Sequence, residues 1–204
     1  MMNKMLRHPK SVPLEKAKKV LILLHGRGAE ASDILSLGDE LAEQFYIVAP
    51  EARDLTWYPY GLMGTDNQNE PWLTASVQII SELISVIARQ ISKDQIYLMG
   101  FSQGASLSLE VTARHADKFG GVVAFAGGLI GQQVNPAKYS GDYKKTKIFI
   151  GLGDQDQYVP VIRAEQSKTV LEQLNADVTL TIYPGMGHII SPEEFEWAKS
   201  HVLT

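Results

Sequence analysis

The 204-residue sequence contains no cysteine. Disulfide bonds, thiolate metal sites, iron–sulfur clusters and cysteine nucleophiles are therefore excluded, and the fold depends on the packing of its hydrophobic residues, which make up 45% of the chain. Long hydrophobic runs are also missing. The longest stretch without charged or strongly polar residues, 119–131, is rich in glycine and shorter than the roughly 18 residues that a membrane helix needs. We therefore expect no membrane partner.

The amino terminus lacks the continuous apolar segment and small-residue cleavage site of a signal peptide, so we expect a cytoplasmic protein. An excess of basic charge is absent as well, because 19 Lys and Arg stand against 23 Asp and Glu. Six of these basic residues and a single acid lie in residues 1–19, which leaves an acidic remainder and argues against a nucleic-acid partner. We expect residues 1–18 to form a solvated N-terminal arm and residues 19–204 a single domain, present as a monomer or a homodimer.

Short apolar segments rich in β-branched residues alternate with longer segments of helical periodicity. This alternation is typical of an α/β fold in which a mostly parallel sheet of about six to seven strands has helices on both faces. Helices are expected at about 32–45, 103–115, 161–174 and 192 to the end, together with a long helix that carries an apolar stripe from Leu73 to Ile91 and a cap at Thr74 or Ser76. Strands are expected at 20–24, 46–49, 96–99, 121–125, 148–152 and 178–183.

Two long segments, 51–71 and 127–145, fit neither pattern and are rich in Gly, Pro, Asn and Tyr. Loops of this length are usually functional, and loops that leave the carboxyl ends of parallel strands form the ligand crevice of such sheets. Their large apolar residues are therefore candidates for substrate binding, although about half of them are as well suited to closing the core, and the aromatic cluster to a dimer contact. The candidates are Trp57, Tyr58, Leu62, Met63, Trp72, Leu129 and Ile130.

The segment Gly100-Phe101-Ser102-Gln103-Gly104 matches the G-x-S-x-G pattern and lies between a predicted strand and a predicted helix. In a nucleophile elbow of this pattern, a sharp turn holds the serine hydroxyl above the sheet, and the glycines allow strand and helix to approach closely. A plain glycine-rich turn is the alternative interpretation. The position at a strand end favours Ser102 as a nucleophile.

A serine hydroxyl needs a base, and in this architecture an acid and then a histidine follow the serine in the chain. His188 lies in a glycine-flanked loop after a predicted strand and is the candidate base, whereas the alternative, His201, lies near the end of the last helix. The loop 153–160 holds Asp154 and Asp156. We favour Asp156 because Asp154 lies close to the strand end, where an aspartate often accepts backbone N–H bonds. The loop does not fit a calcium site, and we expect no metal.

An oxyanion hole needs two fixed N–H donors. The backbone amide of Gln103, directly after the nucleophile, is the first candidate, and the amide of Arg27 in the early glycine-rich loop is the second; the Arg27 side chain is expected to be solvated. The same loop also fits a dinucleotide-binding pattern, with Glu51 as the ribose-binding acid. Glu30 argues against that alternative, since a carboxylate at the start of the helix would repel a pyrophosphate. We expect no cofactor.

Four segments together carry a family resemblance: Leu24-His25-Gly26-Arg27-Gly28, Gly100 to Ala105, Gly153 to Pro160, and Gly187-His188. Over about residues 18–204 the sequence resembles the phospholipase/carboxylesterase family of α/β-hydrolases, which includes the acyl-protein thioesterases. The resemblance implies an α/β-hydrolase fold, a triad of Ser102, His188 and Asp156, and oxyanion donors at Arg27 and Gln103.

The implied activity is hydrolysis of a small-molecule ester, or a thioester, through an acyl-enzyme and without a cofactor. Acyl-protein thioesterases usually have Leu and Asp where this chain has Arg27 and Ala29. This difference favours a hydrolase of small esters with short to medium acyl groups. The alternatives are an acyl-protein thioesterase or lysophospholipase, and an α/β-hydrolase fold that binds a small ligand without turning it over.

Overall fold

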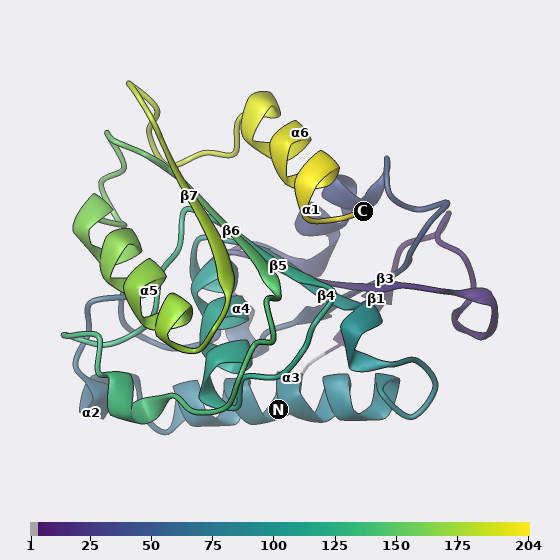
Figure 1. Ribbon diagram of the computed structural model, residues 1–204, viewed down its shortest axis with the longest axis horizontal. Helices are drawn as coiled ribbons and strands as arrows, with labels where there is room; N and C mark the ends of the chain where they lie inside the picture. Colours follow the sequence, from purple (N-terminus) through teal and green to yellow (C-terminus); the bar gives the residue numbers. More distant parts are fainter. Residues whose placement is uncertain (1–3) are drawn as a thin grey trace.

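The predicted alternation of strands and helices is present in the computed structural model, which describes residues 4–204 (Figure 1). Six of its seven strands match predicted strands to within two residues at either end. The strands are β1 (Lys4–Arg7), β2 (Val20–Leu24), β3 (Tyr46–Glu51), β4 (Ile96–Phe101), β5 (Gly121–Phe125), β6 (Lys147–Gly153) and β7 (Asp177–Tyr183).

All seven strands form one sheet in the order β1-β3-β2-β4-β5-β6-β7. Strand β1 is antiparallel to β3, and the other neighbouring pairs are parallel. The residues of β2 and β5 are buried throughout, because helices cover both faces of the sheet. This arrangement confirms the predicted α/β class.

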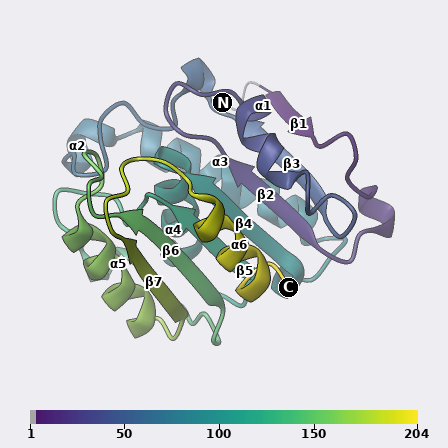
Figure 2. The same cartoon turned by 90° about the horizontal axis from the view of Figure 1, so that it is seen from above.

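Three helices, α3 (Trp72–Ile87), α4 (Gln103–Arg114) and α5 (Val161–Gln173), cover one face of the sheet. Helices α1 (Ala31–Leu35) and α6 (Pro192–His201) cover the other, and Figure 2 shows them in front of the strands. A hydrophobic cluster lies between the sheet and each helical layer. The remaining helical segments are single turns: α2 (Asp66–Asn69) and the 3₁₀ turns Leu14–Lys16, Ser36–Gly38, Arg53–Leu55, Lys93–Gln95 and Pro136–Lys138.

Strand β1 lies in the segment that we expected to be a solvated arm. It pairs with β3, and Leu6 packs against the core cluster on the α1 and α6 side. The Arg7 guanidinium donates to the Ser11 carbonyl at 2.7 Å, which ties the following turn to the strand. The expectation of a solvated arm is therefore wrong for residues 4–11. A four-residue edge strand that contains Lys and Arg has too little apolar sequence to be recognised.

Three helix boundaries also differ from the predictions, and one of them is the end of α3 at Ile87, before Ile91 of the expected apolar stripe. Helix α1 ends at Leu35, because the chain turns at Ser36–Gly38, where Gly38 packs closely against β3. Pro71, not Thr74 or Ser76, precedes α3, and the Ser76 hydroxyl instead donates to a loop carbonyl. Helix α6 begins as predicted, with Ser191 as its N-cap in a reciprocal capping box.

The strand order places a crevice at the carboxyl ends of β2 and β4. Strand β3 lies on one side of β2 and strand β4 on the other, so the loops that leave β2 and β4 diverge at this point. Ligands bind at such switch points in open α/β sheets. The register pairs Leu24 with Gly100, which brings the loop after β2 next to the turn at Ser102.

A buried arginine holds the first part of the 127–145 loop. Arg163 of α5, which is only 1% exposed, donates to the carbonyls of Leu129, Gly131 and Gln132 at 2.8, 2.7 and 3.1 Å. The Gly131 amide in turn donates to the carbonyl of Leu62 at 2.9 Å. The two long loops are therefore fixed to each other and to α5.

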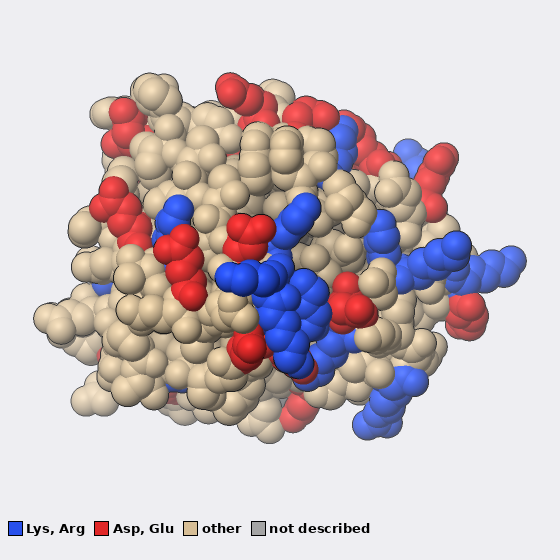
Figure 3. All heavy atoms as spheres, in the orientation of Figure 1, with Lys and Arg blue, Asp and Glu red and all other residues tan. Residues whose placement is uncertain are grey.

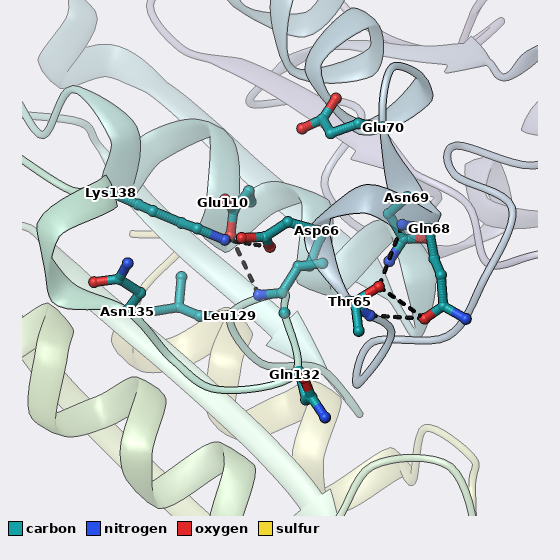
Figure 4. A network of polar contacts seen from close by, with 12 residues as sticks. Thr65, Asp66, Gln68, Asn69, Glu70, Glu110, Leu129, Gln132, Asn135 and Lys138 are labelled. Carbon is teal, nitrogen blue, oxygen red and sulfur yellow. Dashed lines mark hydrogen bonds and ion pairs between the residues drawn. The ribbon is translucent and has the colours of Figure 1, made fainter.

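A buried glutamate holds the same loop from the side of α4. Glu110 accepts hydrogen bonds from the Ile130 amide and from the Tyr139 hydroxyl, at 3.3 and 3.1 Å. Figure 4 shows Glu110 near Lys138, which reaches across to Asp66 of the 51–71 loop and forms an ion pair with it. The path of the loop is thus determined by polar side chains from two helices and from the facing loop.

Acidic and basic side chains lie next to one another on the face of the molecule shown in Figure 3. Ion pairs also link acidic and basic side chains of the described residues; for example, Asp117 contacts both Lys93 and Lys144, at 3.2 and 2.9 Å. Across residues 4–204, none of the helices combines the length and the hydrophobicity that spanning a bilayer requires.

Candidate active site

Ser102 lies on the sharp turn between β4 and α4. Its backbone has φ 55° and ψ −116°, in a region that residues with a side chain rarely adopt. A Cβ atom at Gly104 would overlap the Leu24 carbonyl at the end of β2, and one at Gly100 would overlap the backbone of Gly104. Both glycines of the motif are therefore required for the close approach of strand and helix, and the turn holds the serine at the crevice.

Ser102, His188 and Asp156 form one hydrogen-bonded chain, although they come from the loops after three different strands. The Oγ of Ser102 lies 2.8 Å from Nε2 of His188, and Nδ1 of His188 lies 2.7 Å from Oδ2 of Asp156. Because a carboxylate only accepts hydrogen bonds, Nδ1 carries the proton of a neutral imidazole and donates it. The unprotonated Nε2 then faces the serine hydroxyl, which is the arrangement of a general base.

The two candidate acids have different partners. The other oxygen of Asp156, Oδ1, accepts from the amides of Tyr158 and Val159 at 2.8 and 2.9 Å, and its side chain is fully buried. Asp154 instead accepts from the Gly185 amide at 2.7 Å, and so it braces the loop that carries the histidine. The structure therefore places Asp156 beside the histidine and gives Asp154 a bracing contact.

The imidazole of His188 is held between two aromatic rings. The ring of Phe101 lies 4.9 Å away on one side and that of Tyr158 lies 4.8 Å away, centroid to centroid. These contacts restrict rotation of the imidazole and leave its side chain 19% exposed. The alternative histidine, His201, lies on α6 and stacks on Trp197 at 4.2 Å.

A cavity of about 420 Å³ lies beside Ser102 and His188. Of the seven residues expected to line it, Tyr58 and Leu62 do. The rest of its wall comes from the elbow, from the acid loop and from the loop after β2. Its other lining residues are Gly26, Arg27, Ala29, Gly61, Phe101, Gln103, Ser106, Tyr158 and Val159.

The other five expected lining residues lie elsewhere, so that part of the prediction is wrong. Leu129 and Ile130 are buried in the core, because the polar contacts of their backbone described above turn their side chains inward. Trp57 and Trp72 line a separate groove between the 52–59 segment and α3. Met63 is 43% exposed and lies outside the cavity.

Sequence analysis missed three apolar residues of the cavity wall. Phe101 is the variable position of the serine motif, and Tyr158 and Val159 follow the acid in the same loop. Their proximity in sequence to Ser102 and Asp156 was the available signal, because residues next to these candidates lie in the same crevice.

Arg27 and Gln103, the candidate oxyanion donors, both line the cavity. Within residues 4–204, neither of their backbone N–H groups donates a hydrogen bond to a protein acceptor. The neighbouring Gly28 amide, in contrast, donates to the Leu55 carbonyl at 2.7 Å. Arg27 is exposed, as we expected, and its guanidinium also donates to the carbonyls of the 58–60 segment.

His25 lies in the same loop but has a structural role. Its ring is fully buried, and burial lowers the pKa of the imidazole, which is therefore neutral. Nε2 accepts from the Ala52 amide at 3.0 Å, so Nδ1 carries the proton and donates to the Gly26 carbonyl at 2.7 Å. These bonds join the loops after β2 and β3.

Carboxylates occupy the start of α1, where a dinucleotide would place its pyrophosphate. Glu51 accepts from the Ala31 amide at 3.2 Å, and Glu30 forms a capping box with Asp33. Because these acids use the free amides of the helix start and repel anions, the dinucleotide alternative is wrong. Among the residues that the structure describes, no group of three or more His, Asp or Glu side chains is arranged to hold a metal ion.

Comparison with known proteins gives the family context of this geometry. The sequence model of the phospholipase/carboxylesterase family matches residues 11–204. A crystal structure of a phospholipase/carboxylesterase from Dyadobacter fermentans is 43% identical, with a TM-score of 0.94 over 98% of this chain and 96% of that chain. Acyl-protein thioesterase 1 of Kluyveromyces lactis is 28% identical over 89% of this chain and 90% of that protein. The Arabidopsis thaliana protein named "Probable carboxylesterase SOBER1-like" is 29% identical over 65% of this chain, and the match spans about half (51%) of its length.

Proposed function

The chain belongs to the phospholipase/carboxylesterase family, and from this membership we propose that it is a serine hydrolase that cleaves carboxylic esters through Ser102, His188 and Asp156. The observation that carries the proposal is the chain of hydrogen bonds of 2.8 and 2.7 Å that joins these three side chains beside a cavity. The relatives named as carboxylesterases and thioesterases support the same reaction class.

The reaction begins when Oγ of Ser102 attacks the ester carbonyl carbon and Nε2 of His188 takes its proton. Asp156 stabilises the resulting imidazolium through its bond to Nδ1. The amides of Arg27 and Gln103 donate to the oxygen of the tetrahedral intermediate. His188 then gives its proton to the leaving alcohol, and an acyl-enzyme remains. Water, deprotonated by the same imidazole, then attacks the acyl carbon. The bond between this carbon and Oγ of Ser102 breaks, His188 returns the proton to Oγ, and the carboxylic acid leaves.

The substrates that fit this cavity best are neutral esters with a short to medium acyl group. Leu62, Phe101 and Val159 make the wall largely apolar, and a volume of about 420 Å³ is at the lower end of the range for small-molecule sites. The same steps cleave thioesters, as the names of the thioesterase relatives suggest. Turnover of an ester and of its thioester counterpart with the same acyl group separates these two substrate classes.

Hydrolysis of p-nitrophenyl esters from acetate to palmitate tests the proposal. We expect the wild type to prefer short to medium acyl groups and Ser102→Ala to lower kcat on the order of 10⁶-fold. Ser108→Ala is the matched control, because Ser108 lies on the same helix but outside the cavity, where its hydroxyl donates to the Gly104 carbonyl at 2.9 Å. A fluorophosphonate probe is expected to label the wild type and the control but not Ser102→Ala.

Two results would contradict the proposal. Undiminished hydrolysis by Ser102→Ala would mean that another group is the nucleophile. A folded wild type that neither hydrolyses any ester or thioester nor reacts with the fluorophosphonate would favour a protein that binds a small ligand without turnover.

A further inference from the structure

The side chains of Arg27 and Gln103 meet at one atom, the carbonyl oxygen of Tyr58. Nε2 of Gln103 donates to this oxygen at 2.7 Å, and Nη2 of Arg27 donates to it at 2.9 Å. These are the two residues whose backbone amides are assigned to the oxyanion hole in the proposed function. A single backbone acceptor therefore connects the side chains of both oxyanion donors.

Each of the two side chains also holds the 57–60 segment at a second position. The Arg27 guanidinium donates to the carbonyls of Pro59 and Tyr60 at 2.8 and 2.5 Å. Oε1 of Gln103 accepts from the Trp57 amide at 2.8 Å. Several hydrogen bonds from one planar group fix its orientation as well as its position.

The 57–60 segment is itself anchored to other parts of the fold. The Ser76 hydroxyl of α3 donates to the Trp57 carbonyl at 2.6 Å, and the Trp57 indole donates to the His25 carbonyl at 3.0 Å. Asn69 accepts from the Tyr60 amide at 2.9 Å. Three separate contacts, with α3, with the loop after β2 and with α2, therefore hold the segment, and it does not depend on any one of them.

Two contacts that do not involve the guanidinium hold the backbone on either side of Arg27: Nδ1 of His25 donates to the Gly26 carbonyl at 2.7 Å, and the Gly28 amide donates to the Leu55 carbonyl at 2.7 Å. Glycine flanks Arg27 on both sides, and Gly28 has φ +75°, so side-chain packing does little to restrict this peptide segment. In contrast, Gln103 is the first residue of α4, where the helix fixes the amide. Of the two proposed oxyanion donors, only the Arg27 amide lies outside a helix, and its side chain adds three hydrogen bonds to those of the flanking backbone.

We propose that Arg27 is a positioning residue of the oxyanion hole: its guanidinium, bound to three carbonyls of the 58–60 segment, holds its own backbone N–H at a fixed distance from that of Gln103. This inference rests on the proposed function. Three of the five N–H donors of the guanidinium are used in these bonds, so its main partners are carbonyls of the protein backbone.

The test compares the hydrolysis of p-nitrophenyl butyrate by Arg27→Met, Arg27→Lys and the wild type. It also measures inhibition of each protein by butylboronic acid. The tetrahedral adduct of this boronate on Ser102 places an oxygen in the oxyanion hole. For Arg27→Met we expect kcat to fall about 10- to 100-fold with KM changed by less than about threefold, because only the transition state uses the misplaced donor. The inhibition constant for the boronate is expected to rise by a similar factor. Arg27→Lys keeps the charge but lacks the planar fork, and it should recover only part of the loss.

Ser76→Ala is the matched control. It removes one anchor of the same segment, at the Trp57 carbonyl, but leaves the contacts of Arg27 and Gln103 with Tyr58 intact. We expect it to lower the melting temperature while kcat stays within about twofold of the wild type. If Arg27 had only a structural role, Arg27→Met and Ser76→Ala would lose the same amount of kcat whenever their melting temperatures fell equally.

Three results would overturn the inference: an unchanged kcat in Arg27→Met, full activity in Arg27→Lys, or a rise in KM that is confined to an ester carrying a carboxylate. The second would assign the effect to charge, and the third would make the guanidinium a substrate contact. If Arg27→Met does not fold, kcat and the boronate inhibition constant of Arg27→Lys decide: a partial loss of both supports the inference, and full activity refutes it. An active wild type with unaffected variants refutes this inference alone, whereas a wild type that neither hydrolyses esters nor reacts with the fluorophosphonate refutes the proposed function as well.

Discussion

Glu194 is a buried carboxyl group whose ionisation opposes folding. It lies at the start of α6 and is 0% exposed, packed against Gly151 of β6. Oε2 accepts from the Ser191 amide at 3.3 Å, but Oε1 has no hydrogen-bond partner within residues 4–204. Loss of hydration raises the pKa of this carboxyl from its ordinary 4.5 to about 7.

A carboxyl whose pKa is higher in the folded state than in the unfolded state binds its proton more tightly when folded. Its contribution to the stability of the fold is therefore lost as the pH rises from 4.5 to about 7, and the penalty is constant above that range. Because one pH unit corresponds to about 1.4 kcal/mol, the penalty at pH 8 is about 3 kcal/mol. Glu194→Gln keeps an acceptor for Ser191 and cannot ionise. We expect it to exceed the wild type in free energy of unfolding by up to about 3 kcal/mol at pH 8, with the difference vanishing at pH 4.5 and below.

Urea unfolding at several pH values from about 4 to 8 measures this difference directly. Glu193→Gln is the control, since Glu193 is exposed on the same helical turn, and its effect should stay within about 0.5 kcal/mol at every pH. A Glu194→Gln variant that is less stable than the wild type at pH 8, or whose advantage does not change with pH, would refute the reasoning. The first result would mean that the carboxylate gains more from its surroundings than burial costs it.

Two further predictions concern the elbow and the acid. Asp156→Asn is expected to lower kcat on the order of 10⁴-fold, because it favours the wrong tautomer of the histidine. Asp154→Asn retains the oxygen that accepts from the Gly185 amide and should lower kcat much less. Equal losses of kcat in the two variants would contradict the assignment of Asp156. Gly104→Ala places a methyl group against the end of β2 and is expected to lower the free energy of unfolding by on the order of 3 kcal/mol. In Gly187→Ala the added methyl group points into open space, and the free energy of unfolding should change by less than about 0.5 kcal/mol. Similar melting temperatures of the two variants would argue against the steric explanation.

The central strands were predictable because burial on both faces produces continuous apolar sequence. In β2 the run Val20–Leu24 is entirely buried, and its predicted and observed bounds are the same. Strand β1 has neither the burial nor the continuous apolar sequence, since most of its residues are exposed and its pairing with β3 depends on backbone hydrogen bonds. Sequence patterns report side-chain burial, so an edge strand of this kind leaves no pattern to detect.

The same distinction applies to the site. The position of Ser102 follows from local geometry, because the elbow accommodates only glycine at positions 100 and 104. The cavity wall follows from long-range contacts. Leu129 is equally suitable for a core and for a substrate pocket, and its backbone bonds to the distant Arg163 and Ser167 favour the core.

The contacts of Arg27 are the clearest example of long-range contacts that the sequence does not reveal. Its acceptors are the carbonyls of the 58–60 segment, and every amino acid supplies a carbonyl, so the sequence of that segment contains no sign of the interaction. Conversely, side-chain changes at Pro59 or Tyr60 that leave the backbone path intact preserve all three acceptors. The donor cannot vary in this way, because only a guanidinium offers several N–H groups in one plane. The proposed orientation of the Arg27 amide therefore rests on the side chain of one residue and on the backbone path of another segment, and this contact can be recognised only in the folded structure.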